Sequence, residues 1–114
     1  MSNHRNRFKT LGMLALTMLW SVPACGAGDA AAGKTVYENK CMICHGADGA
    51  SATGYARALG LEPAHLGSDR VQKKSDAEIK KIVQEGSGKM KPVKGLSDQD
   101  LENVITYVRT LTKK

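Results

Sequence analysis

Apolar residues recur every three or four positions in three stretches of the chain, which is the spacing of an amphipathic helix. These stretches predict helices over residues 29–41, 75–85 and 97–111. A Gly- and Ala-rich segment, residues 46–67, follows the first of them and predicts only a short helix at 55–59. Because no stretch alternates apolar and polar residues as a half-buried strand does, the predicted fold class is all-α, with three to four helices.

The first 27 residues have the three-part organisation of a secretory signal peptide. Basic residues form a positive head, residues 11–20 are almost entirely apolar, and small residues predominate in 21–27. The apolar run is too short for a membrane-spanning helix, which needs about 20 residues. We therefore expect that residues 1–27 are cleaved, and that residues 28–114 form one exported, periplasmic domain without a transmembrane span.

Lipidation is the alternative for this segment, because Val22-Pro23-Ala24-Cys25 resembles the motif at which bacterial lipoproteins are processed. Cys25 would then become the N-terminal residue and carry a lipid anchor. A proline directly before the small residue is unusual in such a motif. We therefore favour a mature start at Gly28 and keep the anchor at Cys25 as the alternative.

The positive charge of the chain belongs partly to this leader. The whole chain has 17 Lys and Arg against 11 Asp and Glu, a formal charge of +6. Three of the basic residues precede Gly28, so the mature domain has a formal charge of +3. Such a modest charge gives little support to nucleic-acid binding, which we do not predict.

Aromatic residues are scarce in the predicted mature domain. Phe8 and Trp20 lie in the leader, which leaves only Tyr37, Tyr55 and Tyr107. Aromatic rings supply much of the buried surface in small cores, and domains of this size often need a disulfide, a metal or a cofactor to complete the interior. We therefore expect a large apolar group to fill the centre of the domain.

A Cys-x-x-Cys-His motif, from Cys41 to His45, ends the first predicted helix. Two thiols one helical turn apart can each bond to one vinyl group on the same haem edge, and the adjacent histidine then lies beneath the iron. A thioredoxin-like dithiol would need strands, and a zinc site would need two further ligands. The motif therefore predicts one haem c, attached through Cys41 and Cys44, with His45 as the proximal axial ligand.

Met90 is the predicted second axial ligand. The chain has four other methionines: Met1, Met13 and Met18 in the leader, and Met42 between the two cysteines. Met90 lies in the polar segment 86–92, whose glycines allow the backbone to wrap closely around a ligand. His65 is the rival ligand, but an ordinary loop histidine is the simpler interpretation.

Four motifs in this order resemble those of a class I cytochrome c, nearest to the small single-haem carriers of bacteria and photosynthetic organisms. They are GxxxY at 33–37, CMICHG at 41–46, GKMKP at 88–92 and LSDQDLENVITYVRTL at 96–111. The resemblance extends over nearly the whole mature chain. It implies that the first and last helices cross over one covalently bound haem, where Gly33 and Tyr37 would meet Val104 and Tyr107.

The resemblance also implies a proline whose carbonyl accepts the Nδ1–H of the proximal histidine, and Pro63 is the candidate. One departure from the family pattern is Lys91, which directly follows Met90 where the family commonly has proline. The proline comes one position later, at Pro92, so we expect an altered turn after the ligand.

The implied function is one-electron transfer between a redox donor and a redox acceptor, with the iron cycling between Fe(II) and Fe(III). A methionine ligand opposite histidine raises the reduction potential. Two filled axial positions leave no room for a substrate, so we expect no enzymatic activity. The alternatives are a haem-containing subunit of a larger oxidoreductase and an open-site haem enzyme or gas sensor.

Five lysines near Met90 in the sequence are the candidates for partner docking: Lys80, Lys81, Lys89, Lys91 and Lys94. A ring of positive charge around the exposed haem edge would steer the protein toward acidic surfaces on its partners. The alternative is an ordinary solvated surface, because runs of charge usually serve only solvation.

Overall fold

A computed structural model describes residues 28–50 and 52–112 of the chain. Within these ranges the secondary structure is helical apart from one isolated β-bridge. The helices are α1 (Ala30–Lys40), α2 (Met42–His45), α3 (Gly54–Ala58), α4 (Asp69–Gln72), α5 (Asp76–Glu85) and α6 (Asp98–Thr110). None of these helices is long and apolar enough to cross a bilayer. The predicted leader, including Cys25, lies outside the described residues.

The predicted all-α class is confirmed. The three long predicted helices correspond to α1, α5 and α6, and the short one corresponds to α3, each within about one residue of its predicted bounds. The sequence pattern does not predict α2 and α4, because four residues are too few to show a helical period.

Side-chain caps fix where the long helices begin. The Asp29 carboxylate accepts the backbone N–H of Ala31 at 2.8 Å at the start of α1. Ser75 and Ser97 begin α5 and α6 with complete capping boxes, in which an acidic side chain three residues later bonds back to the serine N–H. Each such cap contributes about 1 kcal/mol, so the sequence determines these helix starts locally.

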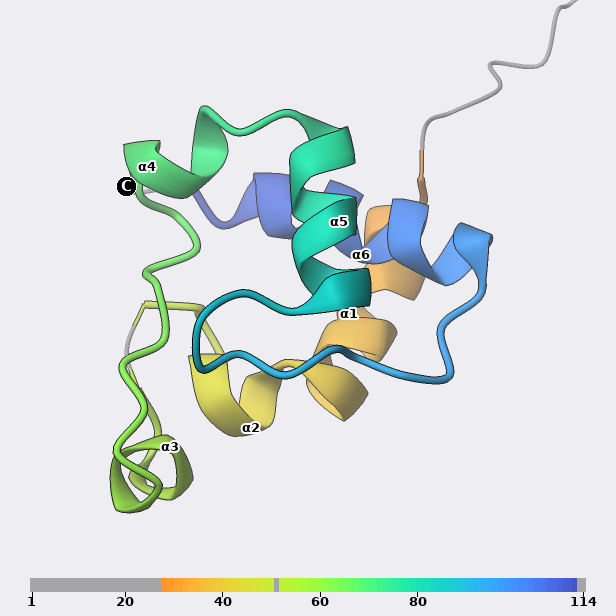
Figure 1. Cartoon of the computed structure of the whole chain (residues 1–114). Coiled ribbons are helices and arrows are strands. Elements are labelled where there is room, and N and C mark those ends of the chain that lie inside the picture. The colour runs from red at the N-terminus through yellow and green to blue at the C-terminus, as the bar shows by residue number, and fades with distance from the viewer. Residues whose placement is uncertain (1–27, 51, 113–114) are drawn as a thin grey trace, which may run out of the picture.

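The helices pack around α6, and Figure 1 shows this arrangement. Helix α1 lies across α6, and α5 packs against α6 from the other side. Helix α2 continues from the end of α1, and α3 lies beyond it at the lower left of the view. In this view the irregular segment that joins α5 to α6 passes between α5 and α2.

The crossing of α1 and α6 depends on a glycine. A Cβ atom added at Gly33 would overlap the backbone carbonyl of Asn103 on α6, so no side chain fits there. One turn later, the ring of Tyr37 lies 5.2 Å from that of Tyr107 at an angle of 55°, and Tyr37 packs with Val104. The crossing that the family resemblance implies, between these two helices and these residues, is therefore present.

Helix α6 supplies residues to two separate apolar clusters. The first cluster joins α5 to α6 and consists of Ile79, Val83, Leu101 and Ile105. The second cluster joins α1 to α6 and consists of Tyr37, Val104 and Val108. Both clusters are small, and the only aromatic ring among their fully buried members is that of Tyr37.

A cluster of hydrogen bonds holds the end of α6 to the junction between α4 and α5. The Arg109 guanidinium donates to the Asp76 carboxylate at 2.6 Å and to the backbone carbonyls of Gln72 and Lys74 at 2.8 and 2.7 Å. The Gln72 amide donates in turn to the carbonyls of Leu66 and Val108. These contacts fix the path of the chain between the Cys-x-x-Cys-His motif and α5.

Replacing Gly33 with alanine tests the crossing. The new Cβ would force α1 away from α6, and we expect the free energy of unfolding of the holoprotein to fall by about 2 kcal/mol. Gly54→Ala is the matched control, because nothing lies within 4 Å of a Cβ at that helical position. We expect that variant to be unchanged or slightly stabilised. Chemical denaturation monitored by circular dichroism measures both, and equal effects would contradict the close approach.

Candidate haem site

The Cys-x-x-Cys-His motif forms a single helical turn at the end of α1. Cys41 is the residue between α1 and α2, and its carbonyl accepts the backbone N–H of Cys44 at 3.2 Å and of His45 at 3.0 Å. Both cysteines are half-buried free thiols. The turn therefore presents two unpaired thiols and a histidine on one short element, which is the arrangement that covalent haem attachment requires.

The environment of Cys41 differs from that of a reactive dithiol. Burial, followed by the neighbouring Cys44, raises the pKa of the Cys41 thiol to about 11. Dithiol oxidoreductases instead lower the pKa of one cysteine so that it attacks as a thiolate. The Cys41 thiol therefore lacks the lowered pKa of a disulfide-exchange site.

One ring nitrogen of His45 forms a hydrogen bond to the backbone. Its Nδ1 lies 3.3 Å from the backbone carbonyl of Ala64, and because a carbonyl only accepts, Nδ1 carries the proton. Burial lowers the pKa of His45, although the hydrogen bond to Ala64 acts in the opposite direction. A neutral ring with Nε2 left as the available nitrogen is the state that ligates iron.

The acceptor for His45 corrects the expectation for Pro63. The carbonyl that faces Nδ1 belongs to Ala64, one residue further along the chain. The family resemblance implies a carbonyl in this role, but the path of the loop decides which residue supplies it. One contact that holds this loop in place is the hydrogen bond from the backbone N–H of Leu66 to the carbonyl of Gly49, at 2.9 Å.

Met90 lies on a tight turn that is fixed on both sides. Its N–H donates to the carbonyl of Ser87 at 2.9 Å, and its own carbonyl accepts the N–H of Ser87 at 3.0 Å. Gly86 has a φ of 80°, and a Cβ there would lie 2.6 Å from the Met90 carbonyl oxygen and 3.0 Å from Pro92. Pro92 thus packs against Gly86 at the start of the turn.

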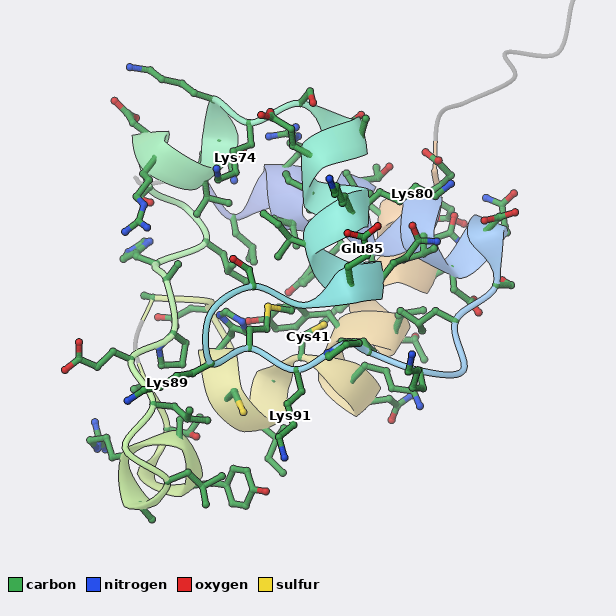
Figure 2. The ribbon with its side chains drawn as sticks, viewed as in Figure 1. Cys41, Lys74, Lys80, Glu85, Lys89 and Lys91 are labelled. Atoms are coloured by element: carbon green, nitrogen blue, oxygen red, sulfur yellow. The ribbon has the colours of Figure 1, made fainter. Side chains whose placement is uncertain are left out.

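The side chains of Met90 and Cys41 meet different parts of the core. Met90 packs against the α5–α6 cluster, and Cys41 packs against the α1–α6 cluster. Figure 2 shows Cys41 beneath the segment that follows α5, between that segment and the ribbon of α1 and α2. Met90 and Cys41 therefore contact two different apolar clusters, both of which include residues of α6.

The five candidate docking lysines do not share one surface. Lys80 forms ion pairs with Asp98 at 3.5 Å and Glu102 at 3.6 Å. Figure 2 shows Lys80 on the α6 side of the molecule, whereas Lys89 and Lys91 project from the Met90 segment near α3 and α2. Lys80 therefore does not belong to the predicted ring of positive charge around the haem edge. Lys81 and Lys94 are exposed.

An apolar surface was not predicted from the sequence. In the part of the chain that the structure describes, four large apolar side chains are exposed: Met42 and Ile43 on α2, Tyr55 on α3, and Leu59, the residue directly after α3. The Thr53 hydroxyl joins these helices by donating to the carbonyl of Ile43. The sequence signals for this surface were the apolar residues between the two cysteines and the spacing of Tyr55 and Leu59 in the short predicted helix, but the sequence does not place that helix beside α2.

His65, the rival ligand, lies near the end of α6. Its Cε1 atom is 3.2 Å from the position of a Cβ at Gly67, which would itself overlap the carbonyl of Leu111. Its Nδ1 is buried and has no hydrogen-bond partner in residues 28–50 and 52–112. His65 thus lies beside Gly67, and its carbonyl accepts the hydroxyl of Ser68, whereas Met90 packs against the α5–α6 cluster.

Comparison with known proteins identifies the fold. Residues 28–108 match the family model described as cytochrome C oxidase, cbb3-type, subunit III. The chain belongs to the cytochrome c family. The cofactor of this family is covalently bound haem c with its iron, and the free thiols, the neutral His45 ring and the fixed Met90 turn fit that group.

Two relatives align with this chain over nearly their whole lengths. Cytochrome c-554(547) of Halothiobacillus neapolitanus is 36% identical over an alignment of 91 residues, which covers 75% of this chain and 99% of the relative. Cytochrome c6 of Picosynechococcus sp. is 35% identical over an alignment of 107 residues, which covers 88% of this chain and 92% of the relative. The solved KustC0563 c-type cytochrome has a TM-score of 0.59 and 30% identity, covering 71% of this chain and 98% of its own. This chain is thus a small c-type cytochrome.

Proposed function

We propose that this small c-type cytochrome carries single electrons between a redox donor and a redox acceptor. Cys41 and Cys44 hold the haem through thioether bonds, and His45 and Met90 are the axial ligands. The observation that carries the proposal is the contact between His45 Nδ1 and the Ala64 carbonyl, which leaves Nε2 for the iron. The turn that fixes the Met90 backbone supports the second ligand.

The chemistry that bound haem c supplies is a one-electron Fe(II)/Fe(III) couple. The Met90 thioether favours the ferrous state more than a second imidazole would, and so raises the reduction potential. The aliphatic cluster around Met90 lowers the local polarity, which also disfavours the more highly charged ferric state. The hydrogen bond to Ala64 holds the His45 ring in one tautomer and one orientation, which would keep Nε2 available to the iron.

Two ligands from the protein leave no position for a substrate, so we propose a carrier rather than an enzyme or gas sensor. The second candidate is a subunit of a larger oxidoreductase, because the matching family model is described as subunit III of an oxidase. The two similar relatives are named as individual cytochromes, and the chain covers 99% and 92% of their lengths. This agreement in length favours the separate carrier.

We also propose that residues 1–27 are a secretory signal peptide and that the carrier works in the periplasm. The packing of Gly28 supports a mature start at this residue. A Cβ at Gly28 would overlap the carbonyl of Glu102, and the next N–H, that of Asp29, donates to Asn103 at 2.8 Å. The two residues directly after the proposed cleavage site therefore pack against α6.

Partner docking is proposed for the exposed surface of α2 and α3. Its apolar residues, which begin with Met42 and Ile43 between the haem cysteines, give a surface that a partner can cover. Lys89 and Lys91 lie beside this surface and favour acidic partners. The Lys89 ammonium also donates to the carbonyl of Gly60 at 3.1 Å, which holds the Met90 segment against the end of α3.

Replacing Met90 with alanine tests the axial ligand. We expect the near-red charge-transfer band of a ferric thioether complex to disappear, and the midpoint potential to fall by on the order of 0.1 V. Met42→Ala is the matched control, because Met42 is exposed between the two cysteines and should leave the band in place. Optical redox titration measures both quantities. A band that persists in the Met90 variant would refute this ligand.

Single charge removals test the docking surface. We expect Lys91→Gln to slow oxidation of the ferrous protein by ferricyanide about threefold at low ionic strength, and the difference to vanish at high salt. Lys80→Gln removes the same charge from the α6 side and should have a smaller effect. Stopped-flow rates across a salt series measure this. Equal slowing by both variants would contradict the proposed docking surface, because only the net charge of the protein would then affect the oxidation rate.

The mass of the holoprotein from the periplasm tests the leader. Cleavage after Ala27 gives a chain that starts at Gly28 with an unmodified N-terminus, and we expect that mass plus one haem. A lipidated chain starting at Cys25 would instead be heavier by three residues and its acyl groups, and would fractionate with membranes. Intact-mass spectrometry with N-terminal sequencing distinguishes these products.

A further inference from the structure

We infer that Tyr37 is a positioning residue for His45. Its ring is fixed at the α1–α6 crossing, and its hydroxyl holds the backbone next to His45, so the crossing sets the position of the proposed haem ligand. This inference deepens the proposed function and rests on it, because it takes His45 to be an axial ligand. The relevant atoms are the Tyr37 hydroxyl on α1 and the backbone carbonyl of Gly46, the residue that follows His45.

Tyr37 contacts the Cys-x-x-Cys-His motif at both of its ends. Its backbone carbonyl accepts the N–H of Cys41 at 2.8 Å, at the start of the motif. Its side-chain hydroxyl donates to the carbonyl of Gly46 at 2.6 Å, directly after the motif. A single residue of α1 thus fixes both the entry to and the exit from the haem-binding turn.

The haem-binding turn needs such external contacts. Helix α2 has only four residues, and a single turn does not offset the entropic cost of helix nucleation. Thr53 holds one side of the turn, through its hydroxyl on the Ile43 carbonyl and its N–H on the Cys44 carbonyl at 3.4 Å. The hydroxyl of Tyr37 holds the end that carries His45.

Tyr37 is itself among the most firmly held side chains of the domain. Its exposed fraction is 0%, and its ring packs against Tyr107, Val104 and Val108. Burial raises the pKa of its phenol well above the usual range, so the hydroxyl remains a proton donor at neutral and moderately alkaline pH. The donor therefore has a fixed place and a fixed protonation state.

His45 is consequently held by two anchors of different origin. The Ala64 carbonyl holds the ring through Nδ1, and the Tyr37 hydroxyl holds the backbone through Gly46. The first anchor belongs to a loop, and the second belongs to the helix crossing. Losing the second would allow the end of α2 to move and the imidazole plane to change its orientation relative to the haem, while the apolar packing of the ring at position 37 remains.

Tyr37→Phe in the holoprotein removes only the hydroxyl. We expect amide hydrogen exchange at His45 and Gly46 to accelerate about fivefold, as loss of one hydrogen bond implies. We also expect altered paramagnetic NMR shifts of the haem methyls and of the His45 side chain in the ferric state, because these shifts report the ligand plane. Tyr107→Phe is the matched control, since it removes a hydroxyl from the other ring of the same pair and should change neither quantity.

Equal changes in both variants, or unchanged exchange and shifts in Tyr37→Phe, would overturn the inference and leave Tyr37 a packing residue. A measurement on the wild-type holoprotein does not depend on either variant. We expect a slowly exchanging Tyr37 hydroxyl proton close to Gly46 in NMR spectra, and a rapidly exchanging one overturns the inference. Failure of the proposed function is distinguishable, because the wild-type ferric spectrum would then lack the low-spin signature of a haem with two axial ligands from the protein.

Discussion

The close approach of α1 and α6 is the constraint on which the rest of the domain depends. It exists because Gly33 has no side chain and lies directly against the carbonyl of Asn103. The Asn103 side chain, buried at the same crossing, accepts the N–H of Asp29 and so fixes where α1 begins. One turn after Gly33, Tyr37 packs between α1 and α6. Its hydroxyl donates to the carbonyl of Gly46, directly after the Cys-x-x-Cys-His turn, and so links the helix crossing to that turn.

The elements that form the site have little stability of their own. Helix α2 is a single turn, and the segment with Met90 is irregular, so each takes its position from contacts with longer helices. Tyr37 anchors α2 to α1, and the hydrogen bond from Val93 N–H to the Val83 carbonyl, at 2.8 Å, anchors the Met90 segment to α5. The two proposed axial ligands therefore depend on different apolar clusters: Met90 packs against the α5–α6 cluster, and His45 follows Cys41, which packs against the α1–α6 cluster.

The composition of the core agrees with an interior that a cofactor completes. Two aliphatic clusters with one fully buried aromatic ring are a small interior for a domain of this length. The haem c of the family is a large, flat and mostly apolar group, and it supplies the aromatic surface that the sequence lacks after residue 27. Scarcity of Phe and Trp is thus a consequence of packing helices around a cofactor.

The sequence by itself determined the helices and the haem-binding motif, because caps, helical periodicity and the spacing of Cys41, Cys44 and His45 act over a few neighbouring residues. Only the tertiary structure decided which groups reach the motif from elsewhere in the chain. The acceptor for His45 is Ala64 rather than Pro63, and Lys80 belongs to an ion-pair cluster rather than to a docking ring. Each of these outcomes depends on the path of a loop or the facing of a helix in space, which spacing along the chain does not specify.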